Sequence, residues 1–497
     1  RPVEGLEIHL ARRLIMTVLT LDLGTSVLKA ALWTDGKPVA ERSAIIPLHT
    51  EGTIAEQDPN TWWQLAGDLI RDLAPGQVDG IGVTAQMHAI VPTDAEGRAL
   101  TPVPIVMDRR AQAEVDELTA APGWRTIHEI SGGRLDVTCV LPKLRHLTRS
   151  AEGETWRKAT WLLPPKDFLR FQLTGIAASD PIDAAGTLLW NINTKTWDDT
   201  LIELAGIRSE QLPPVQPTLS VAGKLTDQAA QALGLSAGIP IVTGGGDDIE
   251  TLGAGVLAPG DFFEHCGTTG SLYLATDQFI LDPIGEVETY PDIVPGRWIM
   301  GASTTTAGAA LAWARRVLAL EENDAPKNGL PKLADTPGDL IFLPFLAGER
   351  GPWWNAALTG SWIGMRPEHT AADLYRAAVE GVFFSLHSLQ ASMQTHAPTT
   401  NGMVHTSGPL GLDISGAQAR ADLYGRDVRR RGTLPQSTAF AAAIITEATL
   451  TNTDPYALAD QRLEIVWTCS PGPNQSAWNE GAQRYHQAAS AAHQASQ

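Results

Sequence analysis

The chain has 497 residues, of which 43% are hydrophobic and 19% are charged, and its formal net charge at pH 7 is −19. This length exceeds the roughly 250–300 residues at which a single hydrophobic core stops growing, so at least two domains are expected. The acidic balance argues against nucleic acid or an anionic membrane as the main partner, because both are bound by clustered Lys and Arg.

The cysteines indicate a reducing compartment. Cys139, Cys266 and Cys469 are far apart and form no CxxC motif, which argues against a disulfide framework or a zinc site and fits the cytoplasm. No apolar run reaches the roughly 20 residues that span a bilayer. Residues 1–15 precede a plausible start at Met16, and we interpret them as a leader or tag remnant outside the fold.

The first half of the chain alternates apolar strands with turns and helices. Residues 17–46 predict three strands joined by two tight turns, because β-branched and apolar runs are separated by Gly-containing turns. A helix is predicted over 60–74 and a strand over 78–85. Helices and short strands then alternate as far as a strand over 239–243. This alternation predicts an α/β architecture.

A second hairpin, predicted over residues 261–276, repeats the turn of the first. Gly24-Thr25-Ser26 in the first hairpin corresponds to Gly267-Thr268-Thr269 in the second, about half the chain away. Such a repeat suggests two related domains. The copies differ two residues before the glycine, where the first has Asp22 and the second has His265.

The remaining apolar segments complete the second half of the chain. Helices are predicted over 371–393 and 437–448 from their apolar spacing. We place the domain boundary near Gly244, which divides the chain into domains over 16–243 and 244–497.

The two Gly-Thr-Thr/Ser turns suggest a nucleotide site. A Gly-rich turn exposes consecutive N–H groups, so a pair of such turns could hold a polyphosphate between two domains. Each turn taken alone is better explained as an ordinary hairpin turn, and it is their repetition, with an acid in only one copy, that favours a nucleotide site. Asp22 would then hold Mg²⁺, which prefers carboxylate and water oxygens. The sequence has neither a Walker A motif nor a GxGxxG motif after a strand, which argues against those two nucleotide-binding folds.

Nine motifs resemble the FGGY family of carbohydrate kinases, and within it the xylulokinase pattern most. They occur in family order and span nearly all of the chain after Met16. They are LDLGTSVLKAALW, EQDPNTWW, GIGVTAQMHAIV, MDRRA, WLLPPKDFLRFQLTG, SDPIDAAGTLLWN, VTGGGDD, HCGTTGS and FLPFLAGERGPWWN. The resemblance implies two actin-like ATPase (ribonuclease H-like) domains with the active site in the interdomain cleft. It also implies phosphate transfer from MgATP to a sugar hydroxyl.

The resemblance assigns the catalytic role to Asp247, which follows three glycines. In this role Asp247 would take the proton from the sugar hydroxyl and would also contact the sugar. Its neighbour Asp248 is interpreted first as a helix N-cap, since aspartate at a helix start accepts backbone N–H bonds. The alternative is that a second carboxylate raises the proton affinity of Asp247.

The resemblance places the sugar beside Gln86, Met87 and His88, with Asp108 in the segment that follows. Outside the motif, a lone histidine is more often structural than ligand-binding. Ala89 stands where the family has glycine, and MDRRA replaces a W-N-D-G-R type of sequence. These departures put the identity of the sugar in question more than the kinase activity.

Several further motif residues have two interpretations each. Asp183 lies near the cleft or caps a turn. Glu349 and Arg350 contact the cleft or form a structural ion pair. Lys166 and Asp167 belong to a signature helix in which packing is their main role. Tryptophans near the motifs form a wall of the sugar pocket or part of the core, namely Trp62, Trp63, Trp353 and Trp354.

The adenosine end departs most from the family pattern. Related kinases carry a GGGA-x-S loop, whereas this chain has HTSGPLGLD, which keeps Gly408 and Gly411 but has Pro409 between them. Because proline lacks an N–H and fixes φ, nucleotide preference is expected to differ from the family norm.

The sequence therefore predicts an ATP- and Mg²⁺-dependent kinase that converts D-xylulose to D-xylulose 5-phosphate. Alternatives on the same fold are kinases for ribulose, glycerol, erythritol or gluconate, and a non-catalytic sugar- or nucleotide-binding regulator. An actin- or Hsp70-like ATPase is a further rival, disfavoured by the QMH and DAAGT segments. The expected partners are a sugar, ATP and a second copy of the chain in a homodimer.

Overall fold

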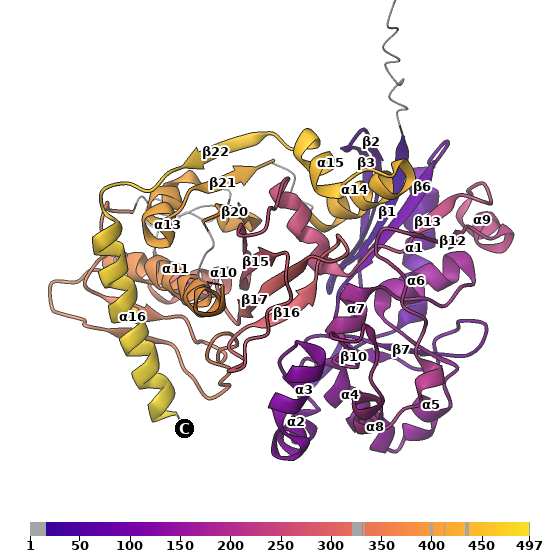
Figure 1. Ribbon diagram of the computed structural model, residues 1–497, viewed down its shortest axis with the longest axis horizontal. Coiled ribbons are helices and arrows are strands. Elements are labelled where there is room, and N and C mark those ends of the chain that lie inside the picture. Colours follow the sequence, from indigo (N-terminus) through magenta and orange to yellow (C-terminus); the bar gives the residue numbers. More distant parts are fainter. Residues whose placement is uncertain are drawn as a thin grey trace, which may run out of the picture.

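The computed structural model describes residues 16–320, 331, 333–397, 401–411, 413–432 and 437–496. Residues 1–15, interpreted above as a leader or tag, lie outside the described residues. Two α/β bodies lie side by side, each built around one large sheet (Figure 1). None of the described helices is both long and apolar enough to cross a bilayer.

The first sheet has six strands in the order β12-β13-β6-β1-β2-β3. Strand β1 pairs antiparallel with β2, and β2 pairs antiparallel with β3. On its other side β1 pairs parallel with β6, then β6 parallel with β13, and β12 closes the edge antiparallel. The strands are β1 Thr17–Leu23, β2 Val27–Thr34, β3 Lys37–Ile45, β6 Gly80–Ala85, β12 Val221–Lys224 and β13 Pro240–Val242.

The second sheet repeats this pattern with one strand added, in the order β16-β17-β15-β14-β20-β21-β22. The central β14 pairs antiparallel with β15 and parallel with β20, as β1 does with β2 and β6. The strands are β14 Phe262–Cys266, β15 Gly270–Thr276, β16 Glu288–Pro291, β17 Trp298–Thr304, β20 Val404–Ser407, β21 Val428–Arg431 and β22 Ile465–Cys469. The two predicted hairpins are confirmed, and each lies at the centre of its sheet.

Short strands outside the two sheets support the loops between them. Three of them form one small sheet: β4 His49–Glu51, β5 Ile54–Gln57 and β8 Val103–Pro104. Three pairs complete the set: β7 Val91–Thr93 with β9 Trp161–Leu163, β10 Trp190–Asn191 with β11 Thr196–Trp197, and β18 Ile341–Leu343 with β19 Ser361–Ile363.

Helix α1 (Pro59–Leu73) shows how local sequence determines a helix. The side chain of Asp58 accepts a hydrogen bond from the N–H of Asn60, and proline occupies the first turn, where its missing N–H has no intrahelical partner. Trp62, Ala66 and Ile70 recur every four residues, so they face the core together. The helix predicted over 60–74 is confirmed.

The other helices cover the two sheets. In the first half they are α2 Gln112–Leu118, α3 Trp124–Ser131, α4 Val140–Arg149, α5 Gly153–Lys158, α6 Pro165–Thr174, α7 Pro181–Gly186, α8 Asp199–Ala205 and α9 Asp227–Leu233. In the second half they are the 3-10 helix η3 Asp247–Ala254, then α10 Gly308–Val317, α11 Ala371–His396, α12 Gly408–Gly411, α13 Ala417–Tyr424, α14 Ser437–Thr451, α15 Pro455–Arg462 and α16 Gln475–Ala495. The helices predicted over 371–393 and 437–448 are confirmed as α11 and α14.

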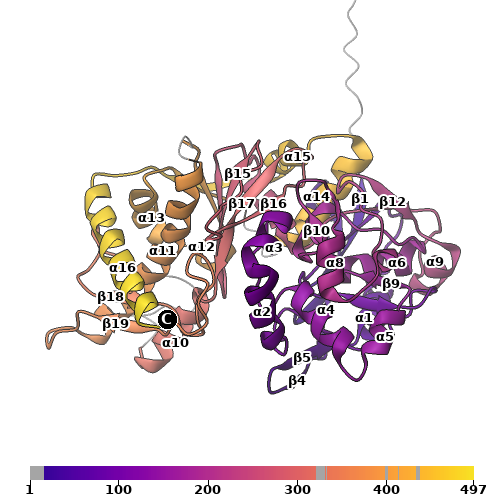
Figure 2. The ribbon, with the colours of Figure 1, turned by 60° about the horizontal axis from the view of Figure 1, so that its bottom comes forward.

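Helix α14 belongs to the second half of the sequence but lies beside β1 and β6 of the first sheet (Figures 1 and 2). The contact is close because β6 presents glycines. A Cβ on Gly82 would lie 2.4 Å from Oγ1 of Thr446, and a Cβ on Gly80 would lie 2.5 Å from Leu450. This helix shares a hydrophobic core with residues of both halves.

Candidate active site

The three glycines before Asp247 are required by close packing. Gly244 has a φ of +66°, and a Cβ there would lie 2.8 Å from the carbonyl oxygen of Val83 in β6. A Cβ on Gly246 would lie 2.4 Å from Cγ of Met87 and 2.8 Å from Oδ1 of Asp183. Strand β6, Met87 and helix α7 can therefore approach this segment only because it lacks side chains.

Asp247 begins η3 directly after this glycine segment, and its side chain reaches solvent. Desolvation by the surrounding protein raises the pKa of its carboxyl well above the usual range, and the charges of Asp248, Glu250 and Asp22 raise it further. Water at the exposed side chain reduces the size of this effect. A carboxylate with raised proton affinity is suited to accept a proton near neutral pH.

The predicted capping role of Asp248 is wrong. The N-cap of η3 is Gly246, and no side chain caps this helix. Asp248 is the second residue of η3 and is half-buried, and its own pKa is raised to about 7 by burial and by the charges of Glu250 and Glu288. The alternative interpretation holds instead, because the charge of Asp248 raises the pKa of Asp247.

Lys166 supports the glycine segment from below. Its Nζ donates to the carbonyl oxygen of Thr243 at 3.1 Å and lies 2.9 Å from Oδ2 of Asp180 and 3.3 Å from Oδ2 of Asp183. Asp167, Asp180 and Asp183 are the one group of three carboxylates among the described residues with a metal-like spacing. The buried ammonium of Lys166 already provides a cation there, so Lys166 and Asp167 do more than pack.

Asp22 lies at the end of β1 and is buried. Its Oδ2 accepts a hydrogen bond of 2.7 Å from Oγ1 of Thr438 and lies 3.9 Å from Nζ of Lys29. Burial raises the pKa of this carboxyl, while Thr438 and Lys29 oppose the rise. The charge of Asp22 contributes to the raised pKa of Asp247. The carboxylate of Asp22 is a donor that fits Mg²⁺, whose charge would offset this repulsion.

Both predicted phosphate turns present their outer edge to solvent. Ser26 in the β1–β2 turn and Thr268 in the β14–β15 turn are exposed. The second turn rests on the start of α10, where a Cβ on Gly308 would lie 2.5 Å from the carbonyl oxygen of Gly267. Thr269 lines the cavity described below.

The QMH segment lies between the first turn and the glycine segment. The N–H of Gln86 donates to the carbonyl oxygen of Leu23 at 2.7 Å, while Met87 packs against Gly246. His88 has a φ of +61°, an uncommon conformation for a residue with a side chain. Nζ of Lys143 donates to the carbonyl oxygen of His88 at 3.0 Å.

The surroundings of His88 favour a neutral imidazole. Burial lowers its pKa to about 4, and the charges of Lys143 and Arg350 lower it further. Its Nδ1 is buried and has no partner. Because Arg350 comes from the other half of the chain, His88 lies where the two halves face each other. One ring N–H hydrogen-bonds to the backbone of Gly186, so the neutral imidazole offers its Nδ1 as an acceptor for a sugar hydroxyl.

Asp108 is placed differently from the other predicted sugar contacts. It is fully buried, and its Oδ2 accepts hydrogen bonds from the N–H of Ala55 at 2.8 Å and from Nη2 of Arg110 at 2.7 Å. Contact with a sugar would require Arg110 to release this carboxylate. The adjacent Met107 and Arg109 line the interdomain cavity instead.

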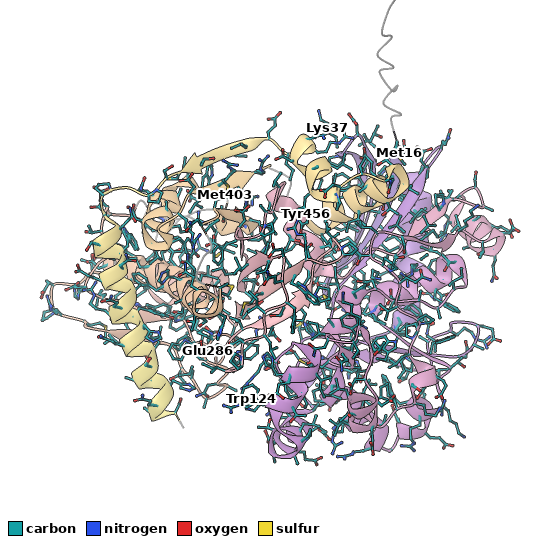
Figure 3. All side chains as sticks on the ribbon, in the orientation of Figure 1. Met16, Lys37, Trp124, Glu286, Met403 and Tyr456 are labelled. Atoms are coloured by element: carbon teal, nitrogen blue, oxygen red, sulfur yellow. The ribbon has the colours of Figure 1, made fainter. Side chains whose placement is uncertain are left out.

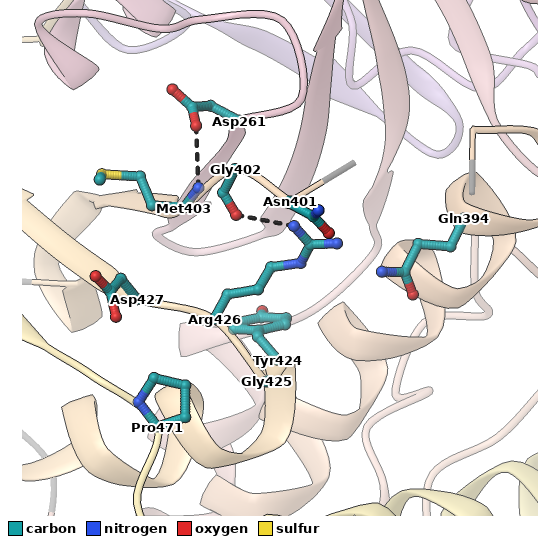
Figure 4. Close-up of a pocket in the computed structure, with 10 residues that line it drawn as sticks. All are labelled: Asp261, Gln394, Asn401, Gly402, Met403, Tyr424, Gly425, Arg426, Asp427 and Pro471. Atoms are coloured by element: carbon teal, nitrogen blue, oxygen red, sulfur yellow. Dashed lines mark hydrogen bonds between the residues drawn. The ribbon is translucent and has the colours of Figure 1, made fainter. Parts of the chain in front are cut away.

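A cavity of about 470 Å³ lies between residues 106–138 of the first half and 269–356 of the second. Its wall includes residues of three predicted motifs: Met107 and Arg109 of MDRRA, Thr269 of the second phosphate turn, and Glu349, Arg350 and Trp354 of the GER segment. A larger cavity of about 580 Å³ lies on the second half alone (Figure 4). None of the predicted site residues lines that cavity, and its Arg426 and Asp261 bond to Gly402 and Met403. The interdomain cavity is therefore the better candidate of the two, although Asp22, Asp247 and the QMH residues are not among the residues that line it.

Two residues of this cavity, Trp124 and Arg134, are not predicted from the sequence, and a third, Trp354, is predicted with two alternative roles. The guanidinium carbon of Arg134 lies 3.4 Å from the ring centre of Trp124 and 5.8 Å from that of Trp354. Trp354 donates to the carbonyl oxygen of Glu286 at 2.9 Å. Figure 3 labels Trp124 and Glu286, which come from the two halves. Trp124 and Arg134 lie in no motif, so only their spatial convergence identifies them.

The other tryptophans have different roles. Trp62 is fully buried in the core of the first half. Trp353 packs against His486 and His493 of α16.

Glu349 and Arg350 form no ion pair with each other within the described residues. Oε1 of Glu349 instead accepts hydrogen bonds from the backbone N–H groups of Thr305 and Arg350. Burial raises the pKa of Glu349 to about 7, which these hydrogen bonds partly oppose. Glu349 thus fixes the backbone of the GER motif. Nη2 of Arg350 donates to the carbonyl oxygen of Thr304 at 3.3 Å, and Arg350 also lines the cavity.

The predicted adenosine loop lies against the second phosphate turn. Gly408 has a φ of +77°, and a Cβ there would lie 2.6 Å from the carbonyl oxygen of Cys266, one residue before Gly267. Gly411 packs against Thr406 in the same way. Pro409 is exposed within α12. The glycines therefore allow the loop to approach the turn, and the proline faces outward.

Comparison with known proteins identifies the family. The model of the FGGY carbohydrate kinase N-terminal domain matches residues 17–253, and that of the C-terminal domain matches residues 265–449. Xylulose kinase of Escherichia coli (strain K12) is 29% identical over 416 residues, covering 81% of this chain and 82% of the relative. Gluconokinase of Bacillus subtilis (strain 168) is 26% identical, covering 75% and 76%.

Solved structures agree with this match. The crystal structure of a xyloylose kinase from Brucella ovis superposes with a TM-score of 0.89 at 28% identity, covering 96% of this chain and 99% of that one. The predicted α/β fold of two actin-like ATPase domains is thereby confirmed, as is the predicted phosphotransferase class. The chain belongs to the FGGY family of carbohydrate kinases.

Proposed function

We propose that the chain transfers the γ-phosphate of ATP to a hydroxyl of D-xylulose, giving D-xylulose 5-phosphate, with Asp247 as the general base. The observation that carries this proposal is the position of Asp247 at the end of a tightly packed glycine segment. Met87 of the QMH motif packs against that segment, and three carboxylates raise the pKa of the base.

The chain's own groups divide the work of the reaction. The sugar would lie against Met87 and His88, with Gln86 behind them and the neutral His88 imidazole hydrogen-bonded to a hydroxyl. Asp247 would accept the proton of the hydroxyl that attacks the γ-phosphate. Arg350, across the cleft from His88, would offset negative charge on the transferring group.

The nucleotide would span the two turns. Gly24, Thr25 and Ser26 on one side and Gly267, Thr268 and Thr269 on the other would donate N–H and hydroxyl groups to its phosphates. The adenosine would lie beside Gly408 and Gly411. Asp22 would hold Mg²⁺, which neutralises phosphate charge when bound.

D-xylulose is the first choice of acceptor because a named xylulose kinase matches over most of this chain at 29% identity. Gluconokinase also matches, so a sugar acid is the specific alternative, and the cationic Arg109, Arg134 and Arg350 on the cavity wall are compatible with it. We further propose a cytoplasmic location, in keeping with the three free cysteines, and assembly as a homodimer.

An ADP-release assay tests the proposed function. Purified protein with MgATP is offered D-xylulose, D-ribulose, glycerol, erythritol and D-gluconate in parallel. We expect ADP release to depend on added sugar and to be fastest with D-xylulose. Faster turnover with D-gluconate would mean that the acceptor is a sugar acid and not D-xylulose, while the proposed kinase activity would stand. ADP release at the same rate with and without each sugar would contradict the proposal.

A further inference from the structure

A buried chain of amides connects the first phosphate turn to the QMH segment. Nε2 of Gln57 donates to the carbonyl oxygen of Thr25 at 2.7 Å. Its Oε1 accepts from Nε2 of Gln86 at 3.0 Å and from Nε1 of Trp62 at 3.1 Å. The two glutamines are each 2% exposed, and Trp62 is fully buried. The indole N–H can only donate, so Oε1 of Gln57 faces Trp62 and its Nε2 faces Thr25.

The second phosphate turn is held at the corresponding atom by a different device. The carbonyl oxygen of Thr268 accepts hydrogen bonds from the N–H groups of Ala307, at 3.0 Å, and Ala309, at 3.1 Å, at the start of α10. Thr25 and Thr268 occupy the same place in the two turns. In each domain, therefore, the threonine carbonyl of the turn is bound from behind.

Binding of that carbonyl determines where the next N–H points. In a trans peptide the C=O and N–H groups point in opposite directions, and the Thr25–Ser26 and Thr268–Thr269 bonds are not among the cis bonds. The N–H groups of Ser26 and Thr269 thus face away from their anchors. In the part of the chain that the structure describes, neither N–H donates a hydrogen bond to another residue.

We propose that Gln57 is a positioning residue, which orients the Ser26 N–H toward the phosphates of the nucleotide and couples that turn to the sugar pocket through Gln86. The proposal rests on the proposed kinase function. Gln86 is suited to couple the turn to the sugar pocket, because its Nε2 donates to Gln57 while its buried Oε1 has no hydrogen-bond partner. A change at the sugar end therefore reaches the phosphate turn through two hydrogen bonds.

The decisive variant is Gln57→Glu, which keeps the size of the side chain and the acceptor for Trp62 and Gln86. It replaces the donor to Thr25 with an oxygen, so the turn loses its anchor. We expect the Kd for ATP, measured by calorimetry without sugar, to rise about tenfold, the equivalent of roughly 1.4 kcal/mol. At low pH the introduced carboxyl is protonated and donates again, so the Kd should return toward the wild-type value.

Gln211→Leu is the matched control. Gln211 is also fully buried, and its Nε2 donates to the carbonyl oxygens of Trp156 and Ala159, but it touches neither turn. This variant should lower the Tm and leave the Kd for ATP unchanged. An equal rise in Kd for both variants, or no rise for Gln57→Glu at any pH, would overturn the positioning role.

A double-mutant cycle tests the coupling. Gln57→Leu and Gln86→Leu should each weaken the mutual enhancement between sugar and nucleotide binding, and the double variant should lose no more than the worse single one. Strictly additive losses would overturn the coupling. Because ATP binding is measured directly, a wild-type protein that binds ATP but phosphorylates no sugar would refute the proposed function separately.

Discussion

The two central hairpins share a backbone plan but not a chemistry. In the first, Asp22 stands two residues before the turn and faces the site of Asp247. In the second, His265 occupies that position, and its Nδ1 lies 3.1 Å from Oε2 of Glu250 and 3.0 Å from Oγ of Ser407. Under the proposed mechanism one copy contributes a carboxylate to the reaction, while the other supports η3, the helix that begins with Asp247. A repeated fold can therefore keep the same turn in both copies and have the acid in only one.

The largest effect is expected from substitution of Asp247, which lies between the two hairpins in the sequence. Asp247→Asn removes the base and should lower kcat by about 10²–10⁴-fold, while the Kd for the sugar changes little. Steady-state ADP release and calorimetry measure the two quantities. Asp199→Asn, at an exposed helix start, is the control, and near-normal turnover of Asp247→Asn would remove Asp247 from the mechanism.

The asymmetry of the two copies predicts unequal effects at equivalent positions. Asp22→Asn should lower kcat at fixed MgATP by about 10²-fold, because several kcal/mol of transition-state charge stabilisation depend on the metal. His265→Asn should cost less than about tenfold, since it loses an ion pair that is partly solvent-accessible. Titration of activity with Mg²⁺ distinguishes the two variants, because only Asp22→Asn should require a higher Mg²⁺ concentration for half-maximal activity. Equal losses would mean that both copies carry the same chemistry.

The second half also contains a buried carboxyl group, that of Glu349, whose effect on the free energy of unfolding depends on pH. The pKa of Glu349 is raised from 4.5 to about 7 in the folded protein, so the stability it contributes is present below pH 4.5 and lost as the pH rises through 7. Glu349→Gln should therefore raise the free energy of unfolding above pH 7 by roughly 1–3 kcal/mol and change little at pH 4.5. The Tm at the two pH values provides the measurement, and a uniform shift would contradict the assignment.

The smallest predicted effect separates the adjacent aspartates. Asp248→Asn removes the charge that most raises the pKa of Asp247, so the acidic limb of the kcat profile should move to lower pH while the plateau stays within a few-fold of wild type. A profile measured from pH 5 to 9 tests this. A shift to higher pH, or a loss as large as that of Asp247→Asn, would reverse the roles of the two residues.

Much of the fold was predictable because its signals are local. The hairpin turns, the capped helix after Asp58 and the apolar spacing of α11 each depend on neighbouring residues. The packing of α14 on the first sheet was not predictable, because the sequence does not reveal which residues meet the glycines of β6. For the same reason Trp124 and Arg134 carried no signal, although they line the candidate site.

The sequence by itself determined the family, the repeated turns and the place of Asp247, since these depend on residue type and order. Only the tertiary structure decided how neighbouring residues divide their roles. The N-cap of η3 is Gly246, so Asp248 does not cap the helix, and its charge instead raises the pKa of Asp247. Asp108 is a buried partner of Arg110. The three glycines became the packing site of Met87 and Asp183. Burial and the approach of distant segments set these roles, and neither is encoded in any single stretch of the chain.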